Sequence, residues 1–69
     1  MTTIVRRTAL VDFSGTGFAG TVRVEYDFLS KESEQEVKTW LGFVARTKVM
    51  KEFGYRLGEI KVDSLQLEN

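Results

Sequence analysis

Few side chains in this 69-residue chain are suited to catalysis, because it contains no histidine and no cysteine. Histidine is the commonest general acid or base near neutral pH, and cysteine is the strongest side-chain nucleophile. An active site would depend on a carboxylate such as Glu25 or Asp27 together with Tyr55, and their spacing points to no particular reaction. The strong zinc and iron ligands are missing as well. We therefore expect a protein that is not an enzyme and that holds no metal and no cofactor.

Glycines form the one motif that is associated with ligand binding. Residues 15–22 read Gly-Thr-Gly-Phe-Ala-Gly-Thr-Val, which resembles the glycine-rich loop of protein kinases, where backbone N–H groups approach the ATP phosphates. The lysine strand and the His-Arg-Asp motif of a kinase are missing from this sequence. A dinucleotide site would need a helix directly after the glycines, and a strand pattern follows them here. We interpret residues 14–20 as a hairpin loop that binds no nucleotide, with Phe18 at its tip folded back on the core or inserted into a partner.

Two strands flank this loop. Val22, Val24, Tyr26 and Phe28 alternate with polar residues, and a period of two over this length is typical of a half-buried strand. Residues 3–13 are rich in β-branched side chains, which also favour a strand. The sequence predicts a β-hairpin over residues 3–29.

A helix and a third strand follow. Ser33 and Glu36 have the spacing of a capping box, and Gly54 is suited to end a helix, so a helix is predicted over residues 33–53. Residues 57–67 regain strand character, with a change of phase at Asp63-Ser64. This change indicates a β-bulge, or a strand end followed by a tail that crosses over.

These elements predict one small α+β domain over residues 1–69, with the order ββαβ. Its three-stranded sheet is antiparallel in the N-terminal hairpin and carries the helix on one face. We expect Val24, Phe28, Leu41 and Val44 in the core. The sequence has no apolar run of about 18 residues and no signal-peptide pattern at its start, so we expect a cytoplasmic protein with no membrane partner.

The predicted helix has two apolar stripes. Val37, Leu41, Val44 and Ala45 form the first, and Trp40, Phe43 and Met50 form the second. Together they span roughly 200°, whereas a helix on one small sheet needs an apolar arc of a little over 100°. Either the sheet and the last residues of the chain curl around the helix, or the second stripe packs against another protein.

Charges are also unevenly distributed. Acidic residues dominate positions 25–36 and basic residues dominate positions 38–56, while the formal net charge is zero. This layout complements the helix dipole. It also leaves a basic end, with Arg46, Lys48 and Lys51, that is able to contact phosphates or an acidic protein.

The sequence thus favours a small non-catalytic protein–protein interaction module, such as an assembly subunit, regulator or inhibitor, that self-associates or binds another protein. A nucleic-acid-binding domain with aromatic and basic contacts is the alternative, disfavoured by the neutral net charge. A weaker alternative is an assembly domain, because Arg-Leu-Gly-Glu-Ile-Lys-Val at residues 56–62 resembles the small linker domains of phycobilisomes. The predicted partner-binding residues are Phe18, Trp40, Phe43, Met50, Arg46, Lys48 and Lys51.

Overall fold

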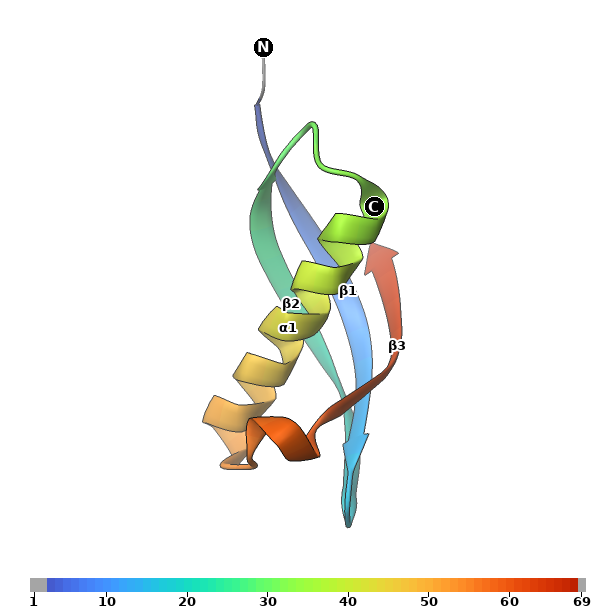
Figure 1. The fold of residues 1–69 in the computed structure, drawn as a ribbon, viewed down its shortest axis with the longest axis vertical. Coiled ribbons are helices and arrows are strands. Elements are labelled where there is room, and N and C mark those ends of the chain that lie inside the picture. Colours follow the sequence, from blue (N-terminus) through green and yellow to red (C-terminus); the bar gives the residue numbers. More distant parts are fainter. Residues whose placement is uncertain (1–2, 69) are drawn as a thin grey trace.

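A computed structural model describes residues 3–68 of the chain and shows a three-stranded sheet with one helix across one face (Figure 1). Strands β1 (Ile4–Gly15) and β2 (Phe18–Leu29) form an antiparallel hairpin. Strand β3 (Lys61–Glu68) pairs antiparallel with the other edge of β1, so the strand order is β2-β1-β3. Helix α1 (Glu34–Phe53) connects β2 to β3. The predicted α+β fold and its ββαβ order are confirmed.

Both ends of α1 are set by the residues that the sequence indicated. The Ser33 side chain accepts a hydrogen bond of 3.2 Å from the Glu36 backbone N–H, which satisfies one of the unpaired donors of the first turn. Gly54 adopts a left-handed conformation with φ of 78° and donates its N–H to the Met50 carbonyl. A residue with a Cβ is disfavoured in this conformation, so glycine ends the helix there.

The hairpin loop is shorter than expected. Strand β1 continues to Gly15 and β2 begins at Phe18, so a two-residue turn replaces the predicted loop over residues 14–20. Only Gly17 in this turn has a positive φ, of 82°. Gly15 and Gly20 lie within the strands instead, and each leaves space for a ring: a Cβ on Gly15 would clash with the Phe18 ring, and one on Gly20 would lie 2.9 Å from the Phe13 ring.

The third strand begins later than the sequence indicated. Residues Leu57–Glu59 form a single turn of 3-10 helix, labelled η1, in place of the predicted strand start at residue 57. The Ile60 N–H donates to the Leu57 carbonyl across this turn. Helix α1 holds the turn in place, because the Arg46 guanidinium donates to the carbonyls of Leu57 and Ile60 at 2.9 and 3.1 Å.

A β-bulge explains the phase change in the last strand. Phe13 of β1 lies opposite Val62, but Asp12 lies opposite Ser64, so Asp63 has no partner across the strand pair. An extra residue exchanges the two faces of a strand. Val62, before the bulge, and Leu65, after it, therefore both pack against the core. The predicted bulge is confirmed, and the alternative of a tail that crosses over is excluded.

The core lies between the sheet and α1. The predicted core positions Val24, Phe28 and Leu41 are buried, whereas Val44 is only partly buried because it lies at the flank of the helix. Phe53, which continues the first helix stripe, is 57% exposed. The buried core residues are Ala9, Val11, Phe13, Val22, Val24, Phe28, Val37, Leu41, Ala45, Val49 and Ile60.

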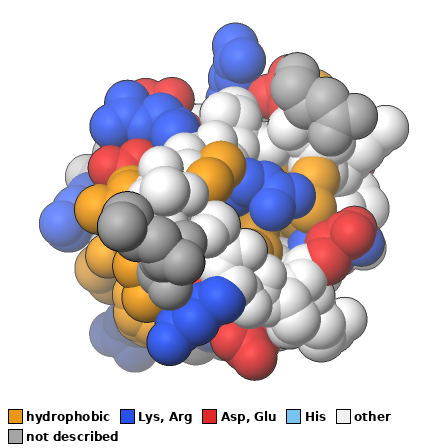
Figure 2. Space-filling view, turned by 90° about the horizontal axis from the view of Figure 1, so that it is seen from above, with side chains coloured by type: hydrophobic (Ala, Val, Ile, Leu, Met, Phe, Trp, Pro, Cys, Tyr) orange, Lys and Arg blue, Asp and Glu red, His pale blue; other side chains and the backbone are white. Residues whose placement is uncertain are grey.

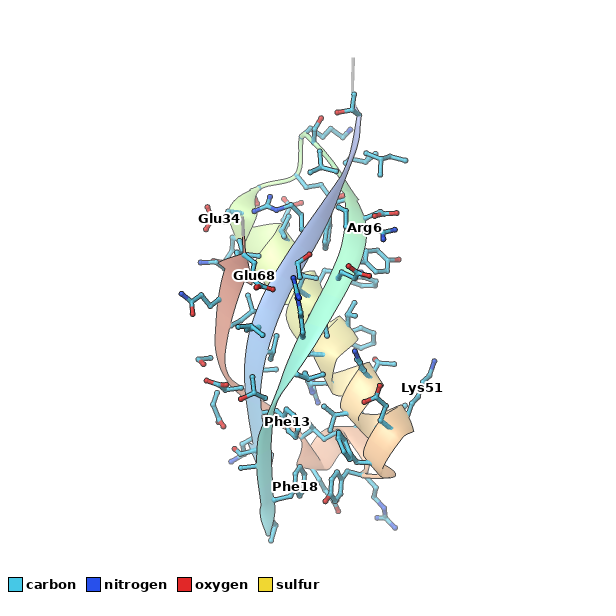
Figure 3. All side chains as sticks on the ribbon, turned by 180° about the vertical axis from the view of Figure 1, so that it is seen from behind. Arg6, Phe13, Phe18, Glu34, Lys51 and Glu68 are labelled. Atoms are coloured by element: carbon cyan, nitrogen blue, oxygen red, sulfur yellow. The ribbon has the colours of Figure 1, made fainter. Side chains whose placement is uncertain are left out.

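The other face of the sheet is polar. Asp12 accepts hydrogen bonds of 2.7 Å from the hydroxyls of Thr21 and Ser64, one on each neighbouring strand. Both bonds stabilise the ionised carboxylate, so they lower the pKa of Asp12, with Thr21 as the larger cause. Arg6 pairs with Asp27 at 2.9 Å, and this hydrogen bond lowers the pKa of Asp27. Figure 3 shows this face, with Arg6 on the strand pair and Phe13 and Phe18 near the hairpin turn.

Candidate protein-binding surface

Three aromatic side chains form a continuous exposed stripe along the flank of α1 over β2. The Trp40 ring contacts Tyr26 in an edge-on arrangement, with centroids 5.8 Å apart, and stacks on Phe43 at 5.4 Å. Tyr26, Trp40 and Phe43 remain 45%, 44% and 46% exposed. Three neighbouring large rings left half in water are typical of a surface that another molecule covers.

The direction in which α1 crosses the sheet leaves this stripe uncovered. Val37, Leu41, Ala45 and Val49 follow one another at steps of four and are buried. At about 100° per residue, such steps rotate the buried line slowly around the helix axis. Trp40 lies about 100° from Leu41, on the β2 side of that line, so the narrow three-stranded sheet covers it only in part, through Tyr26 of the edge strand.

We call this surface the aromatic groove. It is a shallow depression of about 430 Å³ between α1 and the outer edge of β2. Its wall of rings is followed by polar and charged residues toward the end of the helix. Figure 2 shows the largest group of hydrophobic side chains at the lower left of the view, with smaller ones elsewhere among charged side chains of both signs. The residues that line the aromatic groove are Tyr26, Trp40, Phe43, Val44, Thr47, Lys48, Lys51 and Glu52.

An unpaired strand edge runs beside the aromatic groove. The Ser30 N–H donates to the Thr3 carbonyl, and hydrogen-bonded pairs alternate along an antiparallel ladder. Even-numbered residues of β2 therefore bond to β1, and odd-numbered residues direct their backbone groups outward. Within residues 3–68, no strand pairs with this outer edge. Lys48 reaches over it from α1 and donates to the outward Arg23 carbonyl at 3.0 Å.

The structure gathers four of the predicted binding residues in this groove: Trp40, Phe43, Lys48 and Lys51. Lys51 points away from the sheet at the end of the helix (Figure 3). The groove also includes Tyr26, which the alternating pattern of β2 had placed under the helix. The available signal was chemical, because a tyrosine hydroxyl in an otherwise apolar series needs a polar partner or water.

The other predicted binding residues lie elsewhere. Phe18 does not project from a loop tip but folds back and stacks on Tyr55, with centroids 3.7 Å apart. Met50 is half-buried against the core. Arg46 is held by the two carbonyls before β3. These three side chains stabilise the fold at the ends of its elements, so the aromatic groove does not contain them.

Basic side chains are also dispersed more than the sequence indicated. Arg46 and Lys48 donate to backbone carbonyls, and Lys38 pairs with Glu34 at 3.4 Å. Among the described residues, Lys51 is the groove cation that makes no ion pair or side-chain hydrogen bond. Of the three predicted basic residues, Lys48 and Lys51 line the groove, whereas Arg46 donates to the carbonyls before β3.

The side chains considered for catalysis are not brought together. Glu25 and Asp27 lie beside Arg6 on the polar face of the sheet, whereas Tyr55 lies at the hairpin end against Phe18. Within residues 3–68, no three acidic side chains cluster as a metal site. The one helix in that range is too polar to cross a membrane.

No protein-family model, curated protein or solved structure matches the chain. The aromatic groove and the adjoining strand edge are therefore the features that bear on function.

Proposed function

We propose that this chain is a small protein–protein interaction module that binds its partner through the aromatic groove. The supporting observation is the stripe of Tyr26, Trp40 and Phe43, which is apolar, continuous and about half exposed. Tryptophan and tyrosine dominate the binding energy of protein interfaces because a partner desolvates large ring surfaces there. A role in assembly or regulation follows from this proposal. A cytoplasmic location is also part of it, since a chain without cysteine suits a reducing compartment.

The adjoining edge of β2 strengthens the proposal. Its outward N–H and C=O groups offer a partner a row of backbone hydrogen bonds directly beside the apolar stripe. Such an edge is an association risk when nothing covers it. A partner that occupied the groove and the edge together would satisfy both features.

A pull-down with a Trp40→Ala variant tests this proposal. The bait is the full chain in extract from the source cell, with nuclease-treated and high-salt arms. We expect the wild type to retain a protein partner, a second copy included, in both arms, and Trp40→Ala to lose it. Trp→Ala at an interface centre commonly costs about 2 kcal/mol or more of binding, whereas folding should change little at a half-exposed site.

The matched control is Leu10→Ala. The exposed fraction of Leu10 is 41%, similar to the 44% of Trp40, but Leu10 lies on the polar face of the sheet, away from the groove. This variant should retain the partner. Equal retention by Trp40→Ala would contradict the proposal, and release by nuclease would favour the nucleic-acid alternative.

A further inference from the structure

We infer that the partner of the aromatic groove is a second copy of this chain, joined edge to edge through β2. The two three-stranded sheets would form one continuous sheet around a two-fold axis, with both helices on the same face. This inference rests on the proposed function, because it names the occupant of the same surface. It is supported by self-complementarity: the β2 edge and the flank of α1 each match the same surface of a second copy.

The register of the two β2 strands follows from their unused backbone groups. Odd-numbered residues direct these groups outward, so antiparallel pairing must place odd residues opposite odd residues. When Arg23 lies opposite Glu25 of the other copy, the symmetry forms this opposite-charge pair twice. Moving the strands by one step places Glu25 opposite Glu25 or Arg23 opposite Arg23, and like charges directly opposite destabilise a sheet. This register requires Arg23 to exchange its Glu68 partner, 2.9 Å away in the single chain, and Glu25 its Arg6 partner, 3.8 Å away, for the other copy. Charge still favours it over the two neighbouring registers, because each of those places a like-charge pair on the two-fold axis.

The same register matches apolar side chains on the helix side of the sheet. Val24 lies on the two-fold axis and meets its own copy. Tyr26, whose ring is 45% exposed in one chain, comes opposite Val22 of the second copy. Phe28, only 5% exposed in one chain, comes opposite Gly20, above which the Phe13 ring lies. Because Val22, Val24 and Phe28 are already buried in one chain, the apolar surface that this pairing removes from water is mainly that of Tyr26.

The flanks of the two helices are brought together by this pairing. Trp40 contacts Tyr26, and Lys48 reaches Arg23, so α1 runs antiparallel to β2. Val24 and Val44 line one depression, so the axis through Val24 passes near Val44. The helices of the two copies then run antiparallel on either side of that axis.

This arrangement places complementary side chains of the two helices beside one another: an aromatic ring beside a lysine, and an acidic residue toward a basic one. Trp40 and Lys48 lie on opposite sides of Val44, so Trp40 of one copy comes next to Lys48 of the other. The Glu25 N–H of the second copy donates to the Arg23 carbonyl in place of Lys48. The Lys48 ammonium then lies on the face of the Trp40 indole of the other copy. In the same way, Glu36 near the start of α1 in one copy lies toward Lys51 near the end of α1 in the other.

The charge of the whole chain agrees with self-association. Its formal net charge is zero, so two copies do not repel one another at long range. The acidic start and basic end of α1 attract one another only when two helices run antiparallel, as the two-fold axis requires. An unrelated extended peptide has no such built-in match, so we commit to a second copy.

Two charge reversals test this inference by sedimentation equilibrium. The wild type should sediment at twice the chain mass of 7.9 kDa at about 100 µM, where a micromolar dissociation constant gives mostly dimer. Arg23→Glu and Glu25→Arg should each raise that constant about tenfold or more, because both like-charge pairs form in each homodimer. An equimolar mixture of the two variants should recover the dimer, since every cross-strand pair in the heterodimer is again of opposite sign.

Folding and position are controlled within the same experiment. Thermal melts followed by circular dichroism should show that both variants fold, and Lys31→Glu, in the exposed loop after β2, should dimerise like the wild type. Recovery in the mixture supports the register. A mixture that stays monomeric, or single variants that dimerise unchanged, would overturn it.

Failure of this inference and failure of the proposed function give different results. A wild-type chain that stays monomeric at about 100 µM but captures another protein in a Trp40-dependent way overturns the second copy and leaves the proposed function standing. A chain that neither dimerises nor shows Trp40-dependent capture overturns both.

Discussion

The ring of Phe18 lies flat on the ring of Tyr55, with centroids 3.7 Å apart and planes inclined by only 5°. This stack joins the first residue of β2 to the segment that follows α1. Gly15 makes it possible, because a Cβ at that position would clash with the Phe18 ring. An aromatic side chain at the end of a hairpin thus holds the end of the helix to the sheet.

Replacing Phe18 with alanine should lower the free energy of unfolding by about 1–3 kcal/mol. This is less than the cost of removing a fully buried ring, because Phe18 is only partly buried, but it includes the loss of the stack. Chemical denaturation measures the change, and Thr16→Ala in the exposed turn is the matched control. Unchanged stability combined with lost association would instead indicate that Phe18 is part of the binding surface.

Leu41 should be the most sensitive position of α1. Its side chain is 0% exposed between helix and sheet, and Leu41→Ala should cost about 2–5 kcal/mol through lost burial and a cavity. Phe43→Ala, one half-turn away on the same helix and 46% exposed, should cost about 1 kcal/mol or less. Thermal melts of the two variants at equal concentration compare them, and equal losses would show that α1 packs on the sheet by a different face.

Arg46 should act on folding and not on binding. Arg46→Met keeps much of the apolar stem but removes the donors to the Leu57 and Ile60 carbonyls. The Leu57 carbonyl keeps its bond from the Ile60 N–H, but the Ile60 carbonyl loses its Arg46 donor. Leaving a partly buried acceptor unpaired costs about 1–3 kcal/mol, and amide hydrogen exchange of β3 should accelerate. Arg56→Met, at an exposed position, should leave exchange of β3 unchanged. Slow exchange in Arg46→Met would mean that other contacts hold η1.

Protonation of Asp12 at acidic pH should lower the stability of the fold. The pKa of Asp12 is lowered below the ordinary value of 3.8 by the hydroxyls of Thr21 and Ser64. The unfolded chain therefore binds the proton more readily, so this contribution to stability is complete above the ordinary pKa and disappears as the pH falls through the lower pKa of the folded state. Melting temperatures from about pH 6 down to about pH 2 should fall less steeply for Asp12→Asn than for the wild type. Some slope should remain in the variant, because the pKa of Asp27 is also lowered, by its hydrogen bond from Arg6. Parallel curves would show that the hydroxyls do not stabilise the ionised form.

The sequence by itself determined the local elements of this protein. Ser33 and Gly54 fixed the helix ends through bonds to neighbouring backbone groups. The alternation around Val24 predicted which side of β2 is buried. The phase change at Asp63 predicted the bulge that turns both halves of β3 toward the core. Each feature depends on residues a few positions apart, so periodicity and capping rules are enough to find it.

Tertiary structure alone decided which surfaces remain open. Local patterns do not say that β3 pairs with β1 and leaves the outer edge of β2 unpaired, nor that Phe18 finds Tyr55. Trp40 and Tyr26 come from different elements, and their contact depends on the angle at which α1 crosses a narrow sheet. That angle results from the packing of many side chains at once, so no single stretch of the sequence encodes it.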